Sequence, residues 1–473
     1  MSSSPYFEAF DPSSMAEDYP LGEAFLDRFT GLSADELFAL QDRRFRGLLD
    51  FAWRIPFYRR LWGARGLEPG DVPGLAQIDR LPVFDKEDLM RAVEAHPPFG
   101  DFDGADRHPD GHRRPVIVQT TSGTTGRPQP LLFGPESREM QALLLARLYR
   151  LQGLTADDIV HSVYGHGMVN GGHYVREAVL HWLGARMLTA GTGIETRSAQ
   201  QVRLMHEFGA TALIGFGDFV RRLAEVAQEE GLIPGEDIPL RVISGHFGQE
   251  GRDAVSAAWG GAAVFDWYGV GDTGAIAGEG PDRDGLHVLE DAQFVELHSL
   301  DGDGRRVPAG TEGDLVCTCL YKRDVFPIIR FNTHDVSRVR PGDSALGLPF
   351  RRIDGFLGRS DDMVKVRGIN VYPQGIGTLL AARHAEATGE FYCRLETGGD
   401  AEEAPASERL TVVVEVSARP EGLADAMADS LRERLGVGLA VELVAPGETA
   451  AVTQIERRQK PLRLLRTQGG GGT

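Results

Sequence analysis

The chain has few cysteines. Only three of its 473 residues are cysteine, which excludes a disulfide framework of the kind that stabilises small secreted proteins. The Cys-x-Cys spacing of Cys317 and Cys319 is compatible with a metal, but three cysteines do not supply the four ligands of a structural zinc site. Because residues i and i+2 share one face of a strand, we expect these two thiols to pack together in the core.

Long apolar runs are also absent. No run reaches the ~18 residues that a membrane-spanning helix needs. The sequence begins with a polar, acidic stretch that lacks the basic end and the apolar core of a signal peptide. We therefore expect a soluble, cytoplasmic protein that has no membrane partner.

Basic residues are fewer than acidic ones. The chain contains 50 Lys and Arg residues against 69 Asp and Glu residues, which gives a net charge of −19. Since phosphate backbones attract positively charged surfaces, this balance argues against a dedicated nucleic-acid binder. A small anionic ligand is still allowed, because it responds to the local field of its own site.

The residues that are present predict an α/β fold. Residues 1–110 are expected to be mainly helical. Between 115 and about 290, β-branched runs alternate with helical segments, among them an amphipathic helix over 137–153. This alternation predicts a mostly parallel sheet covered by helices on both faces. The apolar residues expected on one face of an N-terminal helix are Leu37, Leu40, Phe45, Leu48, Leu49 and Phe51.

The pattern changes in the last third of the chain. Residues 292–357 are β-rich, and a small α+β unit of about a hundred residues follows them. We predict a large N-terminal domain over 1–360 and a small, mobile C-terminal domain over 361–468. The glycine-rich end, 469–473, is expected to be a flexible tail or a cloning remnant.

The strongest local signal is a loop that is dense in hydroxyl groups and glycines. The sequence TTSGTTGRP, over 120–128, follows a predicted strand. Such a loop suits a polyphosphate, because glycine lets backbone N–H groups approach and Ser or Thr hydroxyls donate further hydrogen bonds. It is not a Walker P-loop, since GxxxxGK[ST] is absent. Taken alone, the cluster fits a polar surface loop equally well.

Three further blocks follow in order: YGVGDTG over 268–274, RFNTHD over 330–335, and GRSDDMVKVRGINVYP over 358–373. Together with the hydroxyl-rich loop, they resemble the adenylate-forming superfamily of acyl-CoA synthetases, peptide-synthetase adenylation domains and luciferases. The more detailed resemblance is to the phenylacetate–CoA ligase family, which the segments FPIIRFNTHD, DGLHVLED and YGHGMVNGG also resemble. The resemblance covers roughly residues 35–465.

The resemblance implies a reaction in two steps. ATP and a carboxylate first give an acyl-adenylate and pyrophosphate, and a thiol, usually coenzyme A, then displaces AMP. A carboxylate is a poor electrophile at neutral pH, and joining it to AMP supplies a good leaving group. The protein has to gather anionic oxygens, align them, and stabilise the charge that develops at phosphorus.

The resemblance also implies nucleotide-binding roles in all four blocks. Asp335 would accept both ribose hydroxyls, Tyr268 would stack on adenine, and Arg359 would lie near the ribose or the phosphates. The other cofactor-binding candidates, in the phosphate loop and beside adenine, are Ser122, Gly123, Thr124, Thr125, Gly126, Ser244, Gly245, His246 and Gly269.

Four residues are implied in catalysis and one in domain motion. Lys460 would reach the α-phosphate during adenylation, although a lone lysine in this position is usually just exposed. Asp272 stands where the family usually has a glutamate that binds Mg²⁺, and a shorter carboxylate can still bind that ion, through a water if needed. Thr273 would contact the α-phosphate, and Arg330 would supply positive charge. Asp361 matches the hinge about which the C-terminal domain rotates.

The sequence departs from the family pattern at two basic positions. Asn332 replaces the usual arginine after the aromatic residue, and His334 occupies the second basic position. The site's positive charge would then have to come from Arg330 and Lys460.

The segment expected to line the acyl pocket differs too. The family commonly shows YGYG followed by apolar residues, whereas this chain has YGHG and then NGGH. Any one histidine here fits a satisfied core histidine equally well, but His166, His173 and His246 together indicate a substrate more polar than phenylacetate, because imidazoles donate and accept hydrogen bonds. The candidates for the substrate pocket are Tyr164, His166, Asn170, Gly171, His173, Gly269 and Gly271.

These observations predict an aryl- or heteroaryl-carboxylate–CoA ligase that uses ATP, Mg²⁺ and coenzyme A. The expected acid carries an amino, hydroxy or indolyl group, and the expected partners are small molecules and a second copy of the chain in a homodimer. One alternative is a diazotase-like enzyme that activates nitrite for reaction with an arylamine. The other is an inactive, nucleotide-binding paralogue, which the altered Glu and Arg positions favour and which Asp272, Asp335 and Lys460 argue against.

Overall fold

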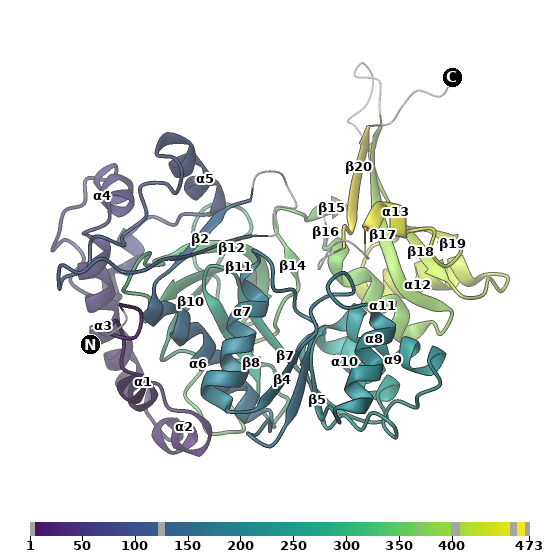
Figure 1. Ribbon diagram of the computed structural model, residues 1–473. Helices are drawn as coiled ribbons and strands as arrows, with labels where there is room; N and C mark the ends of the chain where they lie inside the picture. The colour runs from purple at the N-terminus through teal and green to yellow at the C-terminus, as the bar shows by residue number, and fades with distance from the viewer. Residues whose placement is uncertain (1–4, 122–127, 367–368, 399–406, 455–460, 469–473) are drawn as a thin grey trace.

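Helical, sheet-containing and small α+β regions follow one another along the chain (Figure 1). The N-terminal helices lie on one side of the molecule, the largest sheet lies in the middle, and the C-terminal elements lie on the opposite side. This architecture confirms the predicted fold class. The computed structural model describes residues 5–121, 128–366, 369–398, 407–454 and 461–468.

The N-terminal region is helical, as predicted. Its longest helix begins with a capping box, in which the Ser33 hydroxyl accepts from the Glu36 N–H at 3.3 Å and the Glu36 carboxylate accepts from the Ser33 N–H at 2.9 Å. All six apolar side chains expected on one face of this helix are buried. The elements are α1 (Pro12–Asp18), α2 (Gly22–Phe29), α3 (Ala34–Ala52), α4 (Pro56–Gly63), the 3-10 helix η1 (Leu75–Arg80) and α5 (Lys86–Ala95).

An eight-stranded sheet forms the centre of the fold, in the order β13-β9-β8-β7-β6-β5-β3-β4. From β7 to β4 the neighbouring strands are parallel, and β8, β9 and β13 extend the sheet with antiparallel pairs. The predicted parallel sheet is therefore confirmed, with an antiparallel edge that periodicity did not indicate. Its strands are β3 (Ile159–Ser162), β4 (Arg186–Thr189), β5 (Ala212–Phe216), β6 (Val242–His246), β7 (Ala263–Val270), β8 (Gly274–Glu279), β9 (Leu286–Val288) and β13 (Arg352–Ile353).

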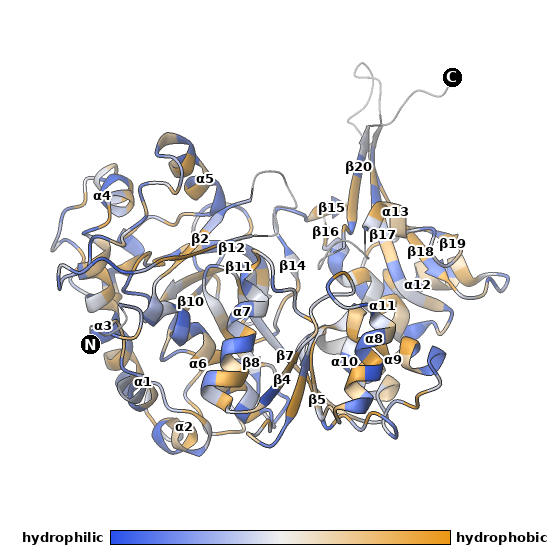
Figure 2. Cartoon of the chain, in the orientation of Figure 1, coloured by the Kyte–Doolittle hydropathy of each residue, from blue (hydrophilic) through white to orange (hydrophobic). Residues whose placement is uncertain are grey.

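Helices cover this sheet, but the first of them differs from the prediction. α6 (Pro135–Leu151) is buried along almost its whole length, so the prediction of an amphipathic helix was wrong. The reason is that its charged side chains are neutralised by distant residues: Arg147 and Asp291 pair at 2.8 Å, both fully buried. In Figure 2, α7 and α8 carry both hydrophobic and hydrophilic residues, as covering helices do. These helices are α7 (Asn170–Glu177), the π-helix η2 (Ala178–Leu183), α8 (Ser198–Glu207), α9 (Gly217–Glu229) and α10 (Gly248–Ala258).

A second, four-stranded antiparallel sheet in the order β10-β11-β12-β14 accounts for the predicted β-rich region. Cys317 and Cys319 lie in β11 with no exposed surface, as expected of packed thiols. The strand that precedes the hydroxyl-rich loop is different: it pairs with the strand after the loop in a separate hairpin and does not join the parallel sheet. The strands are β1 (Ile117–Thr120), β2 (Pro130–Phe133), β10 (Gln293–His298), β11 (Glu312–Cys319), β12 (Phe331–Arg338) and β14 (Gly358–Arg359).

The C-terminal part has a hydrophobic core of its own, formed by residues between Val364 and Leu439. Its four-stranded sheet has the order β19-β18-β17-β20, and in Figure 1 it lies above α8, α9 and α10. Arg463 of this part donates to Asp218 of α9 at 2.9 Å. The elements are β15 (Val364–Val366), β16 (Ile369–Val371), the 3-10 helix η3 (Pro373–Gly375), α11 (Ile376–Arg383), β17 (Ala387–Gly398), β18 (Ser407–Val416), α12 (Leu423–Leu435), β19 (Ala440–Val444), α13 (Ala450–Thr453) and β20 (Leu464–Gln468). Among the described residues, no helix is both long enough and apolar enough to cross a membrane.

Candidate functional site

An aromatic cluster lies at the carboxyl ends of the parallel strands. Tyr164 follows β3, Phe216 ends β5, His246 ends β6, and Trp267 lies near the end of β7. The ring centroids of His246 and Trp267 are 4.3 Å apart, and those of Tyr164 and Phe216 are 4.9 Å apart. The Tyr164 hydroxyl is buried, and no described residue forms a hydrogen bond with it. Because ligands of parallel α/β sheets bind outside the carboxyl ends of the strands, this cluster marks a candidate pocket.

The other two predicted pocket histidines lie next to each other. The rings of His166 and His173 meet edge to face with centroids 5.9 Å apart, and His173 Nε2 donates to the Gly167 carbonyl at 2.7 Å. Burial and the neighbouring His173 lower the pKa of His166. An added Cβ at Gly171 would lie 3.4 Å from the Tyr164 ring, so this segment packs against the aromatic cluster.

Asn170 is fully engaged in a buried polar network. Its side-chain amide donates to the Gly271 carbonyl at 2.9 Å and to the Gln141 amide oxygen at 3.1 Å, and its own oxygen accepts from Arg138. Arg138 is balanced by Glu177 at 2.5 Å. Since both N–H groups of its amide are occupied, Asn170 holds the backbone of Gly271 in place in this arrangement.

Four predicted residues form one hydrogen-bonded chain. The Asp335 carboxylate accepts from the Tyr268 hydroxyl at 2.8 Å through one oxygen and from Arg359 at 3.1 Å through the other. Arg359 also donates twice to Asp361, at 2.8 and 2.6 Å. Asp335 and Arg359 are direct partners in the pairing of β12 with β14. The sheet register therefore brings Asp335 and Arg359 together, and side-chain hydrogen bonds connect them to Tyr268 and to Asp361, the predicted hinge.

A second buried group surrounds Asp272, in the turn between β7 and β8. Its carboxylate accepts from Gln129 at 2.7 Å, and its carbonyl accepts from the ammonium of Lys322 at 3.3 Å. Burial raises the pKa of Asp272, while Lys322 and Gln129 oppose that rise. Thr273 is fully buried beside it, and its hydroxyl donates to the Gly274 carbonyl at 3.1 Å.

Arg330 does not lie with these groups. Its guanidinium makes a bidentate pair with Glu296, at 2.9 and 3.1 Å, and it also contacts Asp79 at 3.2 Å and donates to the Leu81 carbonyl at 2.6 Å. The side chains of Arg330 and Glu296 are 5% and 1% exposed. This placement favours a structural role for Arg330, and the supply of positive charge to the reaction stays a prediction.

Other predicted residues lie inside the sheets or outside the described part of the chain. Ser244 is buried and donates to Gln152 at 2.6 Å. Gly245 lies so close to β5 that an added Cβ would be 1.7 Å from the Gly215 carbonyl oxygen. The predicted site residues outside the described part are Ser122, Gly123, Thr124, Thr125, Gly126 and Lys460.

The chain is similar in sequence to known ligases, although no family model matches it. It is 30% identical over 363 residues to the phenylacetate–coenzyme A ligase of Escherichia coli (strain K12), a match that covers 74% of this chain and 77% of that protein. It is 31% identical over 369 residues to the enzyme of the same name from Pseudomonas putida, with 75% and 77% covered. The chain belongs to the phenylacetate–CoA ligase family.

Solved structures agree with this membership. A 2-hydroxyisobutyryl-CoA ligase in the postadenylation state, in complex with 2-HIB-AMP, is 28% identical, has a TM-score of 0.79, and covers 93% of this chain and 91% of its own. The same ligase in the thioesterification state, with 2-HIB-AMP and CoA, is 27% identical, has a TM-score of 0.65, and covers 93% of this chain and 92% of its own. This member of the phenylacetate–CoA ligase family is an AMP-forming acid–thiol ligase of the adenylate-forming superfamily.

Sequence reasoning missed Lys322 and Gln129. Lys322 is 1% exposed, and its ammonium lies 4.7 Å from the centre of the Phe133 ring. A charged residue in a loop is usually exposed, so the position of Lys322 in the sequence did not indicate that its side chain is buried. A usable signal was composition: only four of the 50 basic residues are lysines, so the choice of lysine over arginine at 322 is itself informative.

We predict that Lys322→Met lowers the adenylation rate of this ligase by about 10–100-fold. Methionine keeps most of the volume, but the buried Asp272 loses its cationic neighbour, and an uncompensated buried charge is strongly unfavourable. Pyrophosphate exchange measures the loss. Arg323→Met is the control, because Arg323 is the next residue and its side chain is 46% exposed. Equal rates in the two variants would contradict the role of Lys322.

Proposed function

We propose that the protein activates an aromatic or heteroaromatic carboxylate with ATP and transfers the acyl group to coenzyme A. The observation that carries the proposal is the hydrogen-bonded chain from Tyr268 through Asp335 and Arg359 to Asp361, in a member of the phenylacetate–CoA ligase family that also has an aromatic cluster at the carboxyl ends of its parallel strands. Flat aromatic walls suit a flat ring. The adjacent His166 and His173 support an acid with a hydrogen-bonding substituent.

The proposed nucleotide site has the carboxylate of Asp335 at its centre. Two donors already reach this carboxylate, so ribose hydroxyls can take the same lone pairs when the nucleotide binds. Tyr268 would present its ring to adenine. The proposed phosphate loop, 122–126, joins two paired strands, and the residue pair that closes it, Thr121 and Gln129, is joined by a backbone hydrogen bond of 3.1 Å. Gln129 also donates to Asp272.

The residues present fit a magnesium ion held together with phosphate oxygens. Among the described residues no group of three or more His, Cys, Asp or Glu side chains could hold a metal by itself. Mg²⁺ bound with a nucleotide commonly takes one or two carboxylates and completes its shell with phosphates and waters, so the single carboxylate of Asp272 suffices. The bound ion would neutralise charge on the phosphate oxygens.

The chemistry then follows from charge and alignment. In the first step a carboxylate oxygen attacks the α-phosphorus, and pyrophosphate leaves with the electron pair of the broken P–O bond. Lys460 and the phosphate-loop N–H groups would stabilise the charge that develops. In the second step the thiol sulfur attacks the acyl carbon, its proton is lost, and AMP leaves.

The two steps require two arrangements of the proposed domains, 1–360 and 361–468, about a hinge at Asp361. Two observations support this part of the proposal. The chain resembles the postadenylation state of 2-hydroxyisobutyryl-CoA ligase, at a TM-score of 0.79, more than its thioesterification state, at 0.65. The contact of Arg463 with Asp218 belongs to the present arrangement and would break on rotation.

A screen of pyrophosphate release tests the proposed function. We expect release with ATP and an amino-, hydroxy- or indolyl-substituted aromatic acid, and thioester formation once coenzyme A is added. Release with nitrite and an arylamine in the absence of coenzyme A would instead identify a diazotase. No release and no pyrophosphate exchange with any acid would identify an inactive paralogue.

Lys460→Ala is predicted to separate the two steps. If Lys460 reaches the α-phosphate in one domain arrangement only, adenylation falls by about 10²–10³-fold while conversion of supplied acyl-AMP to the thioester keeps close to the parent rate. Stopped assays of each half-reaction measure this difference. An equal loss in both steps would contradict the assignment.

A further inference from the structure

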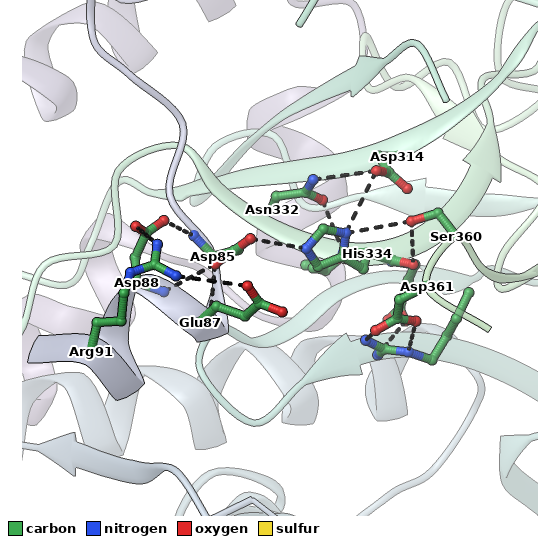
Figure 3. Close-up of polar contacts among 12 residues, drawn as sticks. Asp85, Glu87, Asp88, Arg91, Asp314, Asn332, His334, Ser360 and Asp361 are labelled. Atoms are coloured by element: carbon green, nitrogen blue, oxygen red, sulfur yellow. Dashed lines mark hydrogen bonds and ion pairs between the residues drawn. The ribbon is translucent and has the colours of Figure 1, made fainter. Parts of the chain in front are cut away.

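One histidine joins three separate segments next to the proposed ribose carboxylate (Figure 3). His334 Nε2 lies 3.2 Å from the Asp85 carboxylate, which belongs to the residue that caps α5. Its Nδ1 lies 3.7 Å from the carboxylate of Asp314 in β11 and 3.4 Å from the hydroxyl of Ser360. Ser360 directly precedes the proposed hinge, Asp361.

Backbone hydrogen bonds hold these segments in register. The Phe84 N–H donates to the Arg330 carbonyl at 3.1 Å, and the Asn332 N–H donates to the Phe84 carbonyl at 2.8 Å, which brings Asp85 alongside β12. The Ser360 N–H donates to the His334 carbonyl at 2.8 Å. His334 is therefore fixed through both its side chain and its main chain.

The imidazole ring is placed to carry a positive charge. The charged groups that face it among the described residues are the carboxylates of Asp85 and Asp314, and the neutral side chains of Asn332 and Ser360 complete its surroundings. The two carboxylates raise the pKa of His334 to about 10, and the histidine in turn contributes to lower pKa values of Asp85 and Asp314. The ring thus stays charged throughout the neutral range.

The backbone at this position needs such support. His334 has φ = 57°, in the left-handed region that residues with a Cβ rarely adopt. Such a conformation persists only when surrounding contacts hold it. The next residue is Asp335, so the same contacts set where the Asp335 carboxylate lies.

We propose that His334 is a positioning residue for nucleotide binding: its imidazolium joins Asp85 to Asp314 and thereby fixes the part of β12 that carries Asp335. The inference rests on the proposed function, because that function assigns Asp335 to the ribose. This role also explains how the chain tolerates histidine at the second basic position of the RFNTHD motif. His334 acts by fixing the position of Asp335 and does not touch the reacting atoms.

Calorimetric titration with ATP and Mg²⁺, without any acid, tests the proposal on the full chain. His334→Gln removes the charge and keeps a polar side chain, and we expect ATP affinity to fall about tenfold. His334→Arg restores the charge and should recover most of the affinity. The matched control is His384→Gln, because His384 is also half-buried and hydrogen-bonded, to Ser430 at 2.9 Å, in the C-terminal part of the chain.

Asp85→Asn provides a second variant that keeps the fold. Asparagine still caps α5 but loses the negative charge, so ATP affinity should fall in the same direction, and the double variant with His334→Gln should be no weaker than His334→Gln alone. In steady-state assays the KM for ATP should rise while kcat stays close to that of the parent. The difference between the parent and His334→Gln should be constant from about pH 6 to 9, because the charge persists to about pH 10.

Four outcomes would overturn the inference: equal ATP affinity in the parent and His334→Gln, an equal loss in the His384→Gln control, no recovery in His334→Arg, or a fall confined to kcat. A parent that binds no ATP at all would overturn the proposed function, and this inference with it. If the parent binds ATP and His334→Gln binds it with the same affinity, this inference alone is overturned and the proposed function stands.

Discussion

The carboxylate of Asp335 is the point on which the site depends. Its two oxygens bind donors from different elements, Tyr268 in β7 and Arg359 in β14. Arg359 carries the connection on to Asp361. One buried anion therefore connects a central strand of the large sheet to the β-rich sheet and to the proposed hinge. A ligand that displaced Arg359 from this carboxylate would change the partners of a side chain that also binds Asp361.

Buried ion pairs hold the elements around the site in fixed positions relative to one another. Arg147 of α6 binds Asp291 at 2.8 Å, and Arg330 binds Glu296 at 2.9 Å. In such pairs, removing one partner leaves an unpaired buried charge and costs about 3–5 kcal/mol. Because each pair joins residues that are distant in sequence, the pairs fix how the elements around the site fit together.

Hydrophobic periodicity and strand spacing predicted the elements whose formation depends on residues close together in the sequence. The helical N-terminal region, the alternating strands and helices that form the parallel sheet, and the packed thiols of Cys317 and Cys319 are all confirmed. The prediction of an amphipathic helix at α6 was wrong because its polar residues form ion pairs with residues that are distant in the sequence. Arg147, for example, pairs with Asp291. Periodicity cannot register a partner that lies more than a hundred residues away.

In the candidate site, too, motifs predicted some residues and could not predict contacts between distant segments. Ordered motifs indicated Tyr268, Asp335 and Arg359, which the structure brings together. A motif assigns a role by position, however, and it could not show that the Arg330 guanidinium is occupied by Glu296. Nor could it show that Lys322 lies against Asp272, because that contact depends on how a loop folds back onto a turn.

ATP binding to Asp335→Asn tests whether the Asp335 carboxylate holds the nucleotide. Asparagine keeps the shape of the side chain but offers one acceptor oxygen in place of two and removes the charge that attracts hydroxyl donors. Calorimetric titration of the parent and the variant with ATP and Mg²⁺ compares them without any assumption about the acid. We expect saturable binding to the parent and at least a tenfold weaker affinity, about 1.4 kcal/mol or more, in the variant. Equal affinity in the two proteins would contradict this expectation.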